Sequence, residues 1–173
     1  NNNNILFFIK LKCLAVMTKS FGCITKLFGH IGPLNPGLPV QIPLWMAVNL
    51  KQRHKCRVVP PDWMDVEKLE DKKQEETDSK FFTPMPSKYY MEVTQILLKC
   101  ATADIPRADD VRTLIKDIWD LRIAKLRSSI DTFIKSDATH AKLNHLTLME
   151  INTVRSFLTL SLDQITSVYS HSD

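Results

Sequence analysis

The sequence predicts an α+β protein, mainly α, in which a small N-terminal β-rich module precedes a helical bundle domain. All four glycines lie within the first 37 residues, and no proline follows Pro106. Gly and Pro mark turns and strand ends, whereas a long tract that lacks both favours helices. We therefore expect a β-rich domain over 1–58 and a helical domain over 59–173.

The composition is typical of a folded globular protein. Of the 173 residues, 44% are hydrophobic and 24% are charged, and the net charge is a mild +4. A dedicated nucleic-acid binder usually also concentrates its basic residues on one face. The four cysteines, Cys13, Cys23, Cys56 and Cys100, include no C-x-x-C pair, so a zinc ribbon or redox dithiol has no local signature. Their irregular spacing favours reduced intracellular thiols.

The N-terminal stretch 5–17 is apolar but contains Lys10 and Lys12. A signal peptide carries its positive charge before the apolar core, and a membrane-spanning helix needs about 20 mostly apolar residues. The stretch fits neither pattern well, and we expect a strand or an atypical start. A membrane-attached or secreted protein led by this stretch is an alternative that mapping the mature N-terminus in cells would distinguish.

Turn signals divide the rest of the β-rich module. Residues 32–37 form a turn-rich loop with two glycines and two prolines. The apolar run 40–50 contains Pro43, which confines a strand there to an edge or ends it. Alternatively, residues 44–48 begin a short helix, because periodicity alone cannot assign an apolar run this short to a strand or to a helix. Residues 56–59 fit a last strand before two prolines.

Four helices are expected in the helical domain. They cover about 62–72, 87–101, 107–135 and 147–170. Asp62 is a candidate N-cap for the first helix and Ser87 for the second. Between these two helices, the charged stretch 71–80 predicts a frayed helix end or a linker. The following 81–86 is a rigid extended segment, because each proline restricts the residue before it.

Wide apolar stripes run along the two longest predicted helices. The first stripe contains Val111, Ile115, Ile118, Trp119, Ile123, Leu126, Ile130, Phe133 and Ile134. The second contains Leu148, Ile151, Val154, Leu158, Leu162, Ile165 and Tyr169. Thr147 and Glu150 match a capping box at the start of the last helix. We expect Trp119 to be substantially buried, and Trp45 and Trp63 to have structural roles. The shorter elements can cover only part of these stripes, which predicts apolar surface for other subunits.

No known motif for catalysis, metal binding or cofactor binding is present. The five histidines lack the H-E-x-x-H spacing, and G-x-S-x-G, Walker and G-x-G-x-x-G patterns are missing. Acidic pairs such as Asp109 and Asp110 resemble solvated helix charges. We therefore predict a protein that is not an enzyme, with no catalytic residues, no metal and no cofactor.

Two groups of basic residues are candidates for interaction. The first lies near Trp45 and contains Lys51, Arg53, His54, Lys55 and Arg57. Such a cluster can contact nucleic acid or an acidic partner, but an exposed edge protected against strand pairing is the more frequent explanation. The second group contains Arg122, Lys125 and Arg127 among several aspartates. It can form a charged subunit seam, although solvated helix charges that contribute about 0–1 kcal/mol are more frequent.

Long runs of the chain agree in order with a known family. They include PLNPGLPV at 33–40, IPLWMAVNLK at 42–51, PPDWM at 60–64, FTPMP at 82–86, YYME at 89–92, RTLIKD at 112–117, RIAKLR at 122–127 and LTLMEIN at 146–152. From about residue 24 to the last helix, the chain resembles the second Psf subunits (Psf-two type) of the eukaryotic GINS DNA replication complex. Residues 1–23 depart from the family's opening strand, and Lys26 and His30 fit its second strand poorly.

The resemblance implies a non-catalytic structural subunit of a heterotetramer with three sister GINS subunits. Such a complex joins the Mcm ring helicase and the Cdc-forty-five protein in the nucleus, with mostly indirect DNA contact and no membrane. The family places a small β-rich domain before the helical one, as the glycine distribution also predicts. The alternative is a stand-alone nucleic-acid-binding module that uses residues 51–57, which salt-dependent DNA binding by the isolated chain would favour.

Overall fold

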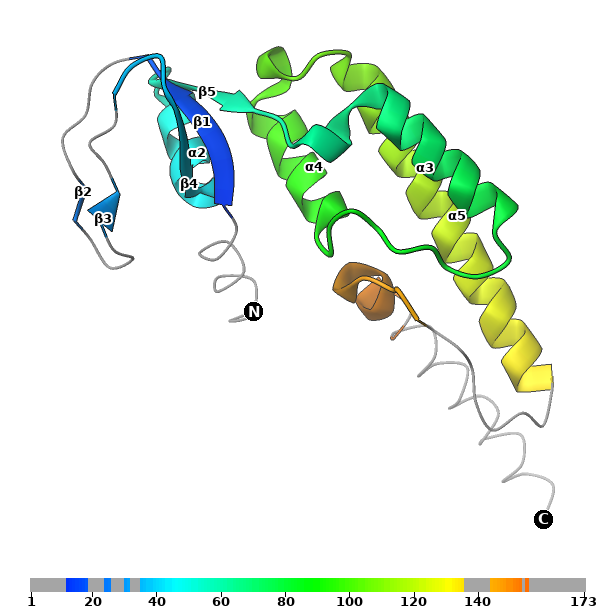
Figure 1. Ribbon diagram of the computed structural model, residues 1–173. Coiled ribbons are helices and arrows are strands. Elements are labelled where there is room, and N and C mark those ends of the chain that lie inside the picture. The colour runs from blue at the N-terminus through cyan, green and yellow to red at the C-terminus, as the bar shows by residue number, and fades with distance from the viewer. Residues whose placement is uncertain are drawn as a thin grey trace. The chain divides into compact units, whose positions relative to one another are not determined.

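The computed structural model describes residues 12–18, 24–25, 30–31, 35–135, 144–153 and 155. Small antiparallel sheets lie near the N-terminus and helices follow, so the predicted α+β fold class is confirmed (Figure 1). The chain divides into two compact units. The first contains Asn1–Leu69 with Val93–Thr113, and the second contains Glu70–Glu92 with Leu114–Asp173. The expected domain boundary after residue 58 stays a prediction.

The first unit contains a three-stranded antiparallel sheet. Its strands are β1 (Lys12–Met17), β4 (Pro39–Pro43) and β5 (Cys56–Val59), in the order β4-β1-β5. Side chains alternate along β1, so that Ala15 is fully buried and Leu14 is 40% exposed. The helix α2 (Leu44–Gln52) contacts all three strands. A separate pair of short strands joins β2 (Ile24–Thr25) to β3 (His30–Ile31).

Pro43 separates a strand from a helix. The strand β4 ends at Pro43 and α2 begins at Leu44. The run 40–50 therefore contains the strand of one interpretation followed by the helix of the other. Proline suits this position because it fixes φ and lacks the N–H that a further ladder bond would need. The helix buries Leu44 and Ala47 against the sheet, whereas Trp45 is 42% exposed. The last strand of this sheet, β5, covers the predicted residues 56–59.

The start of the first long helix differs from the prediction. Asp62 is not its N-cap: Asp62–Met64 form the 3-10 helix η1, which Pro61 precedes, and α3 spans Val66–Asp78. The prediction of a frayed end or linker over 71–80 is also wrong, because α3 continues to Asp78. Charged side chains in this stretch have partners that stabilise the helix, including an ion pair of 2.8 Å between Lys72 and Glu75.

The other predicted helices are present with small shifts of their ends. The helix α4 covers Tyr90–Cys100, the 3-10 helix η2 covers Thr102–Asp104, and α5 covers Ala108–Lys135. Ser87 precedes α4, and its Oγ accepts a hydrogen bond of 3.2 Å from the Tyr89 N–H. Six stripe residues of α5 are buried: Val111, Ile115, Ile118, Ile123, Leu126 and Ile130.

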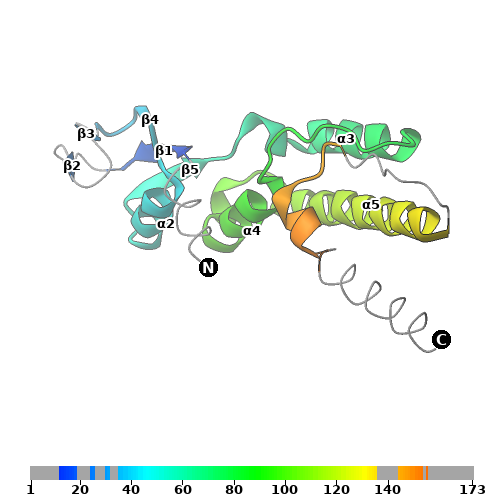
Figure 2. The same ribbon diagram turned by 90° about the horizontal axis from the view of Figure 1, so that it is seen from below.

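In the second unit, α3 lies alongside α5 in both views (Figures 1 and 2). The Lys73 Nζ lies 2.6 Å from the Asp117 Oδ2, which joins the two helices. A core cluster of this unit contains Phe82, Ile123, Leu126 and Ile130, with Trp119 and Leu146 packed against it. Trp119 is only partly buried, so the expectation of substantial burial is too strong.

The two ends of the chain are described only in part. Residues 12–17 of the apolar N-terminal stretch form β1, which confirms a strand there. Residues 148–153 and 155 are helical, as predicted for the last helix, and 156–170 of that prediction lies outside the described residues. Among the residues described, no helix combines the length and the apolar character needed to cross a membrane.

Candidate interaction surfaces and the buried Arg122 cluster

The basic segment 51–57 differs in exposure along its length. The Lys51 Nζ lies 2.6 Å from the Asp104 Oδ2, and the Lys51 side chain is 18% exposed. The Arg57 side chain is 74% exposed, and its Nε lies 3.9 Å from the Asp104 Oδ1. Arg53 and His54 are exposed in the turn between α2 and β5. The outward basic surface is therefore narrower than the sequence pattern indicates.

Asp104 organises this part of the first unit. Its side chain is 6% exposed, and its Oδ2 accepts a hydrogen bond of 2.8 Å from the Val58 N–H. Lys51 lies in the last turn of α2, Val58 belongs to β5, and Asp104 ends η2, so this carboxylate joins three elements. Because β5 is an edge strand, a carboxylate that accepts the hydrogen bond of its Val58 N–H also hinders pairing with a further strand.

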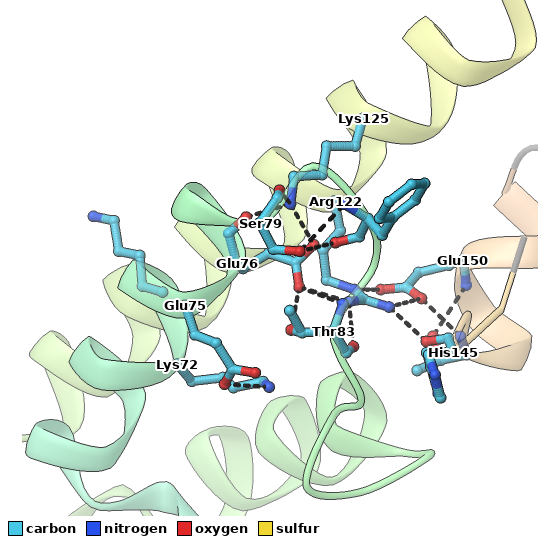
Figure 3. Close-up of polar contacts among 12 residues, drawn as sticks. Lys72, Glu75, Glu76, Ser79, Thr83, Arg122, Lys125, His145 and Glu150 are labelled. Carbon is cyan, nitrogen blue, oxygen red and sulfur yellow. Dashed lines mark hydrogen bonds and ion pairs between the residues drawn. The ribbon is translucent and has the colours of Figure 1, made fainter.

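The guanidinium group of Arg122 is fully buried, which contradicts its expected role as a solvated helix charge. The Nε donates to the Glu150 Oε1 at 2.6 Å, and the Nη1 donates to the Glu76 Oε2 and to the Thr83 carbonyl, both at 3.0 Å. The Nη2 donates to the His145 carbonyl at 2.7 Å and to the Glu150 Oε2 at 3.2 Å (Figure 3). These five contacts match the five N–H donors of an arginine side chain.

Lys125 also points inward. Its Nζ donates to the Glu76 Oε1 at 2.9 Å, to the Ser79 carbonyl at 2.7 Å and to the Glu76 carbonyl. Three acceptors match the three donors of an ammonium group. We call Glu76, Thr83, Arg122, Lys125 and Glu150 the Arg122 cluster. Its two carboxylates and two cations balance, as buried charges require.

Thr83 and Tyr90 complete the hydrogen bonds of the two acids. Thr83 donates to the Glu76 Oε2 from its N–H at 3.1 Å and from its hydroxyl at 2.5 Å. The Tyr90 hydroxyl donates to the Glu150 Oε1 at 3.1 Å. The Phe82 ring centroid lies 5.4 Å from the Arg122 guanidinium carbon, close enough for a cation–π interaction.

The cluster shifts the pKa values of its members. Burial by itself raises the pKa of Glu76, but hydrogen bonds from Thr83 and Lys125 and the charge of Arg122 outweigh burial, so this pKa lies below its ordinary value. Burial lowers the pKa of Arg122, whereas Glu150 and Glu76 raise it above its ordinary value. Burial and the nearby Glu150 carboxylate raise the pKa of Tyr90. The ion pairs therefore favour the charged forms of Glu76 and Arg122.

Thr147 and Glu150 form the predicted capping box. The Thr147 N–H donates to the Glu150 Oε2 at 2.7 Å, and the Glu150 N–H donates to the Thr147 Oγ1 at 3.4 Å. Glu150 has a second role that the pattern does not show, because it also binds Arg122. One sequence signal was available: Arg122 lies four residues after Ile118 and four before Leu126, on the apolar stripe of α5. A charged residue there indicates burial with an acidic partner.

Several apolar side chains remain exposed in each unit. In the first unit they are Leu14, Leu38 and Trp45, and in the second unit they are Phe81, Leu148 and Ile151. Among the residues described, no group of His, Cys, Asp or Glu side chains could hold a metal ion. The acids of the Arg122 cluster already bind cations of the chain itself. The arrangement therefore fixes geometry and leaves apolar surface outside.

Comparison with protein families defines the class. Residues 63–169 match the model of the GINS complex protein helical bundle domain, and residues 20–59 match the PSF2 N-terminal domain. A Xenopus laevis protein named "DNA replication complex GINS protein PSF2" is 61% identical over 137 residues, which cover 79% of this chain and 74% of the relative. The Homo sapiens protein of the same name is 60% identical over 137 residues, with the same coverage.

A Drosophila melanogaster relative extends the similarity further along the chain. This protein is named "Probable DNA replication complex GINS protein PSF2" and is 49% identical over 164 residues, or 94% of this chain and 81% of the relative. The two domain matches follow one another along the chain, at 20–59 and 63–169. The chain therefore belongs to the PSF2 family of GINS complex proteins, which confirms the resemblance seen in its sequence.

Proposed function

We propose that the chain is a non-catalytic structural subunit of a heterotetrameric GINS complex in nuclear DNA replication. The observation that supports this function is the match of both parts of one chain, the N-terminal domain and the helical bundle, to the PSF2 family. In this proposal the complex includes three sister subunits. It assists the Mcm ring helicase together with the Cdc-forty-five protein during initiation and elongation.

Exposed apolar residues support a role in assembly. Leu148 is 57% exposed and Ile151 is 47% exposed, and they lie three positions apart on the same helix. Residues with this spacing share one helix face. A lone exposed apolar side chain is ordinary, whereas neighbouring exposed apolar side chains on one helix face favour an interaction site. Phe81, which is 66% exposed, adds a further apolar group in the second unit.

The proposed mechanism is geometric. The charged groups at the centre of the second unit bind one another, so their contribution is to hold helices and loops in a fixed arrangement. Helical faces would then contact sister subunits, and the remaining faces would hold the helicase and the Cdc-forty-five protein. Contact with DNA is mostly indirect in this proposal.

Co-purification of the tagged full chain from cells tests the proposal. We expect recovery of three partners of similar size in equal amounts, followed by the helicase and the Cdc-forty-five protein at lower salt. Recovery of a stable monomer without partners would contradict the proposed function. Staining for the tagged chain in replicating cells should place it in the nucleus.

Direct nucleic-acid binding is the second candidate function. The exposed side chains of Arg53 and Arg57 favour it, whereas the ion pair of Lys51 with Asp104 makes the basic surface smaller. Replacing both arginines with alanine should reduce the slope of log affinity against log salt by about 2, since each phosphate contact contributes about 0.9. An unchanged slope would exclude these two residues. Arg112→Ala, on exposed α5 surface, serves as the control.

A further inference from the structure

At the start of the last described helix, two polar side chains lie inside and two apolar side chains lie outside. Glu150 is fully buried and Thr147 is 4% exposed, whereas Leu148 and Ile151 are about half exposed. A surface helix normally shows the opposite arrangement, with its apolar stripe toward the core. The chain therefore positions this helix against the preference of its own apolar residues.

Polar contacts hold this segment in place. Arg122 binds the His145 carbonyl and both oxygens of Glu150 (Figure 3). The Tyr90 hydroxyl donates to Glu150 as well. Among the residues described, Leu146 is the apolar side chain of the segment that packs on the core cluster, and it is only partly buried. The orientation of the segment consequently depends mainly on the Arg122 cluster.

Hydrophobic burial and the arginine–carboxylate ion pair differ in how strongly they depend on orientation. Hydrophobic burial has no preferred direction, so it would favour a rotation that covers Leu148 and Ile151. An arginine bound to a carboxylate through two N–H groups fixes both distance and angle. Rotation of the helix would withdraw Glu150 and leave Arg122 buried with one acid fewer, which is strongly unfavourable. Buried ion pairs can in this way specify one arrangement.

We propose that the Arg122 cluster is a positioning centre, which fixes the rotation of the helix that starts at residue 148 and keeps Leu148 and Ile151 on the surface. The occupant of that apolar surface is another subunit of the GINS complex. This last part rests on the proposed function. The positioning itself is a property of the chain and can be measured without a partner.

The first test measures positioning in the full-length chain by amide hydrogen exchange. The variant combines Arg122→Met, Glu76→Gln and Glu150→Gln, so that no fully buried charge is left without its partner. Lys125, which is 20% exposed, loses the Glu76 carboxylate but keeps the carbonyls of Glu76 and Ser79 as acceptors. We expect exchange over 147–153 to accelerate about a hundredfold, while exchange over 114–130 of α5 stays within about threefold of the wild type. Glu75→Gln, an exposed acid beside Glu76, is the control and should change neither region.

Two outcomes of the exchange experiment would overturn the proposal. Unchanged exchange over 147–153 would show that the cluster does not hold the segment. Equal acceleration over 114–130 would show that the cluster supports the whole unit and has no separate positioning role. As a single substitution, Arg122→Lys should retain only part of the wild-type protection from exchange over 147–153, because an ammonium group cannot form the two parallel contacts to Glu150.

The second test measures assembly with co-expressed sister subunits. We expect the triple variant to recover partners at least about tenfold less efficiently than the wild type, a ratio that corresponds to about 1.4 kcal/mol. Leu148→Ser with Ile151→Ser should also reduce recovery while leaving exchange over 147–153 unchanged. Failure of the wild-type chain to recover partners would contradict the proposed function. Equal recovery by the wild type and the triple variant would contradict the positioning centre alone.

Discussion

Asp104 in the first unit and Arg122 in the second unit are both shielded charges, but their partners differ in exposure. Asp104 is shared by Lys51, which is 18% exposed, and Arg57, which is 74% exposed. Arg122 is bound by Glu76 and Glu150, and all three side chains are 0% exposed. Water can replace a lost partner at the first site and cannot reach the second. Breaking an ion pair should therefore lower the free energy of unfolding much more at Arg122 than at Asp104.

Removing the Arg122 side chain should have the largest effect. Arg122→Ala leaves Glu150 buried without its cation and Glu76 with Lys125 alone, which should lower the free energy of unfolding by about 3–5 kcal/mol. Denaturant unfolding of the purified chain measures this difference. The control is Arg112→Ala, whose side chain is 56% exposed beside Asp109 and should cost under about 1 kcal/mol. Equal costs for the two variants would mean that the cluster is solvated.

The next largest loss of stability should come from the apolar core of the second unit, at Trp119. Trp119 packs against the core cluster but is only partly buried. Trp119→Ala should therefore cost about 3 kcal/mol, the lower end of the range for buried aromatic residues. The melting temperature of the chain, measured by calorimetry, should fall accordingly. A shift near zero would place Trp119 outside the packed core.

The pH dependence of stability should report on Glu76 in the Arg122 cluster. The folded state holds the pKa of Glu76 below its ordinary value of 4.5, so its ion pairs stabilise the fold fully above that pH. This stabilisation should decline as pH falls from about 4.5 through the lower, folded-state pKa. Unfolding titrations of the wild type and Glu76→Gln should diverge above this window and converge below it. Parallel curves would show that Glu76 has an ordinary pKa.

The Asp104 site should show the smallest effects. Lys51→Met should lower the free energy of unfolding by about 1 kcal/mol, because the Lys51 pair is short and largely shielded. Arg57→Met should change it by about 0–0.3 kcal/mol, since its contact is long and exposed. Denaturant midpoints of the two variants measure the difference. A larger loss for Arg57 than for Lys51 would reverse the assignment of the stronger partner of Asp104.

Local patterns in the sequence determined much of the fold. The stripe of α5 predicted the helix Ala108–Lys135, and the residues Thr147 and Glu150 predicted a capping box that the structure contains. The position of Pro43 predicted the end of a strand, although periodicity alone left open whether a helix would follow. Each of these features depends on residues a few positions apart, so neighbouring side chains already contain the information.

Tertiary structure decided which charged residues are buried and which residues they pair with. Arg122 was expected in solvent or at a subunit seam, but its partners Glu150 and Glu76 lie 28 and 46 residues away in the sequence. The continuation of α3 to Asp78, within the charged stretch 71–80, likewise accompanies contacts of Lys73 and Glu76 with α5. No local pattern specifies such pairs, because a charge can be buried only where distant segments bring an opposite charge to it.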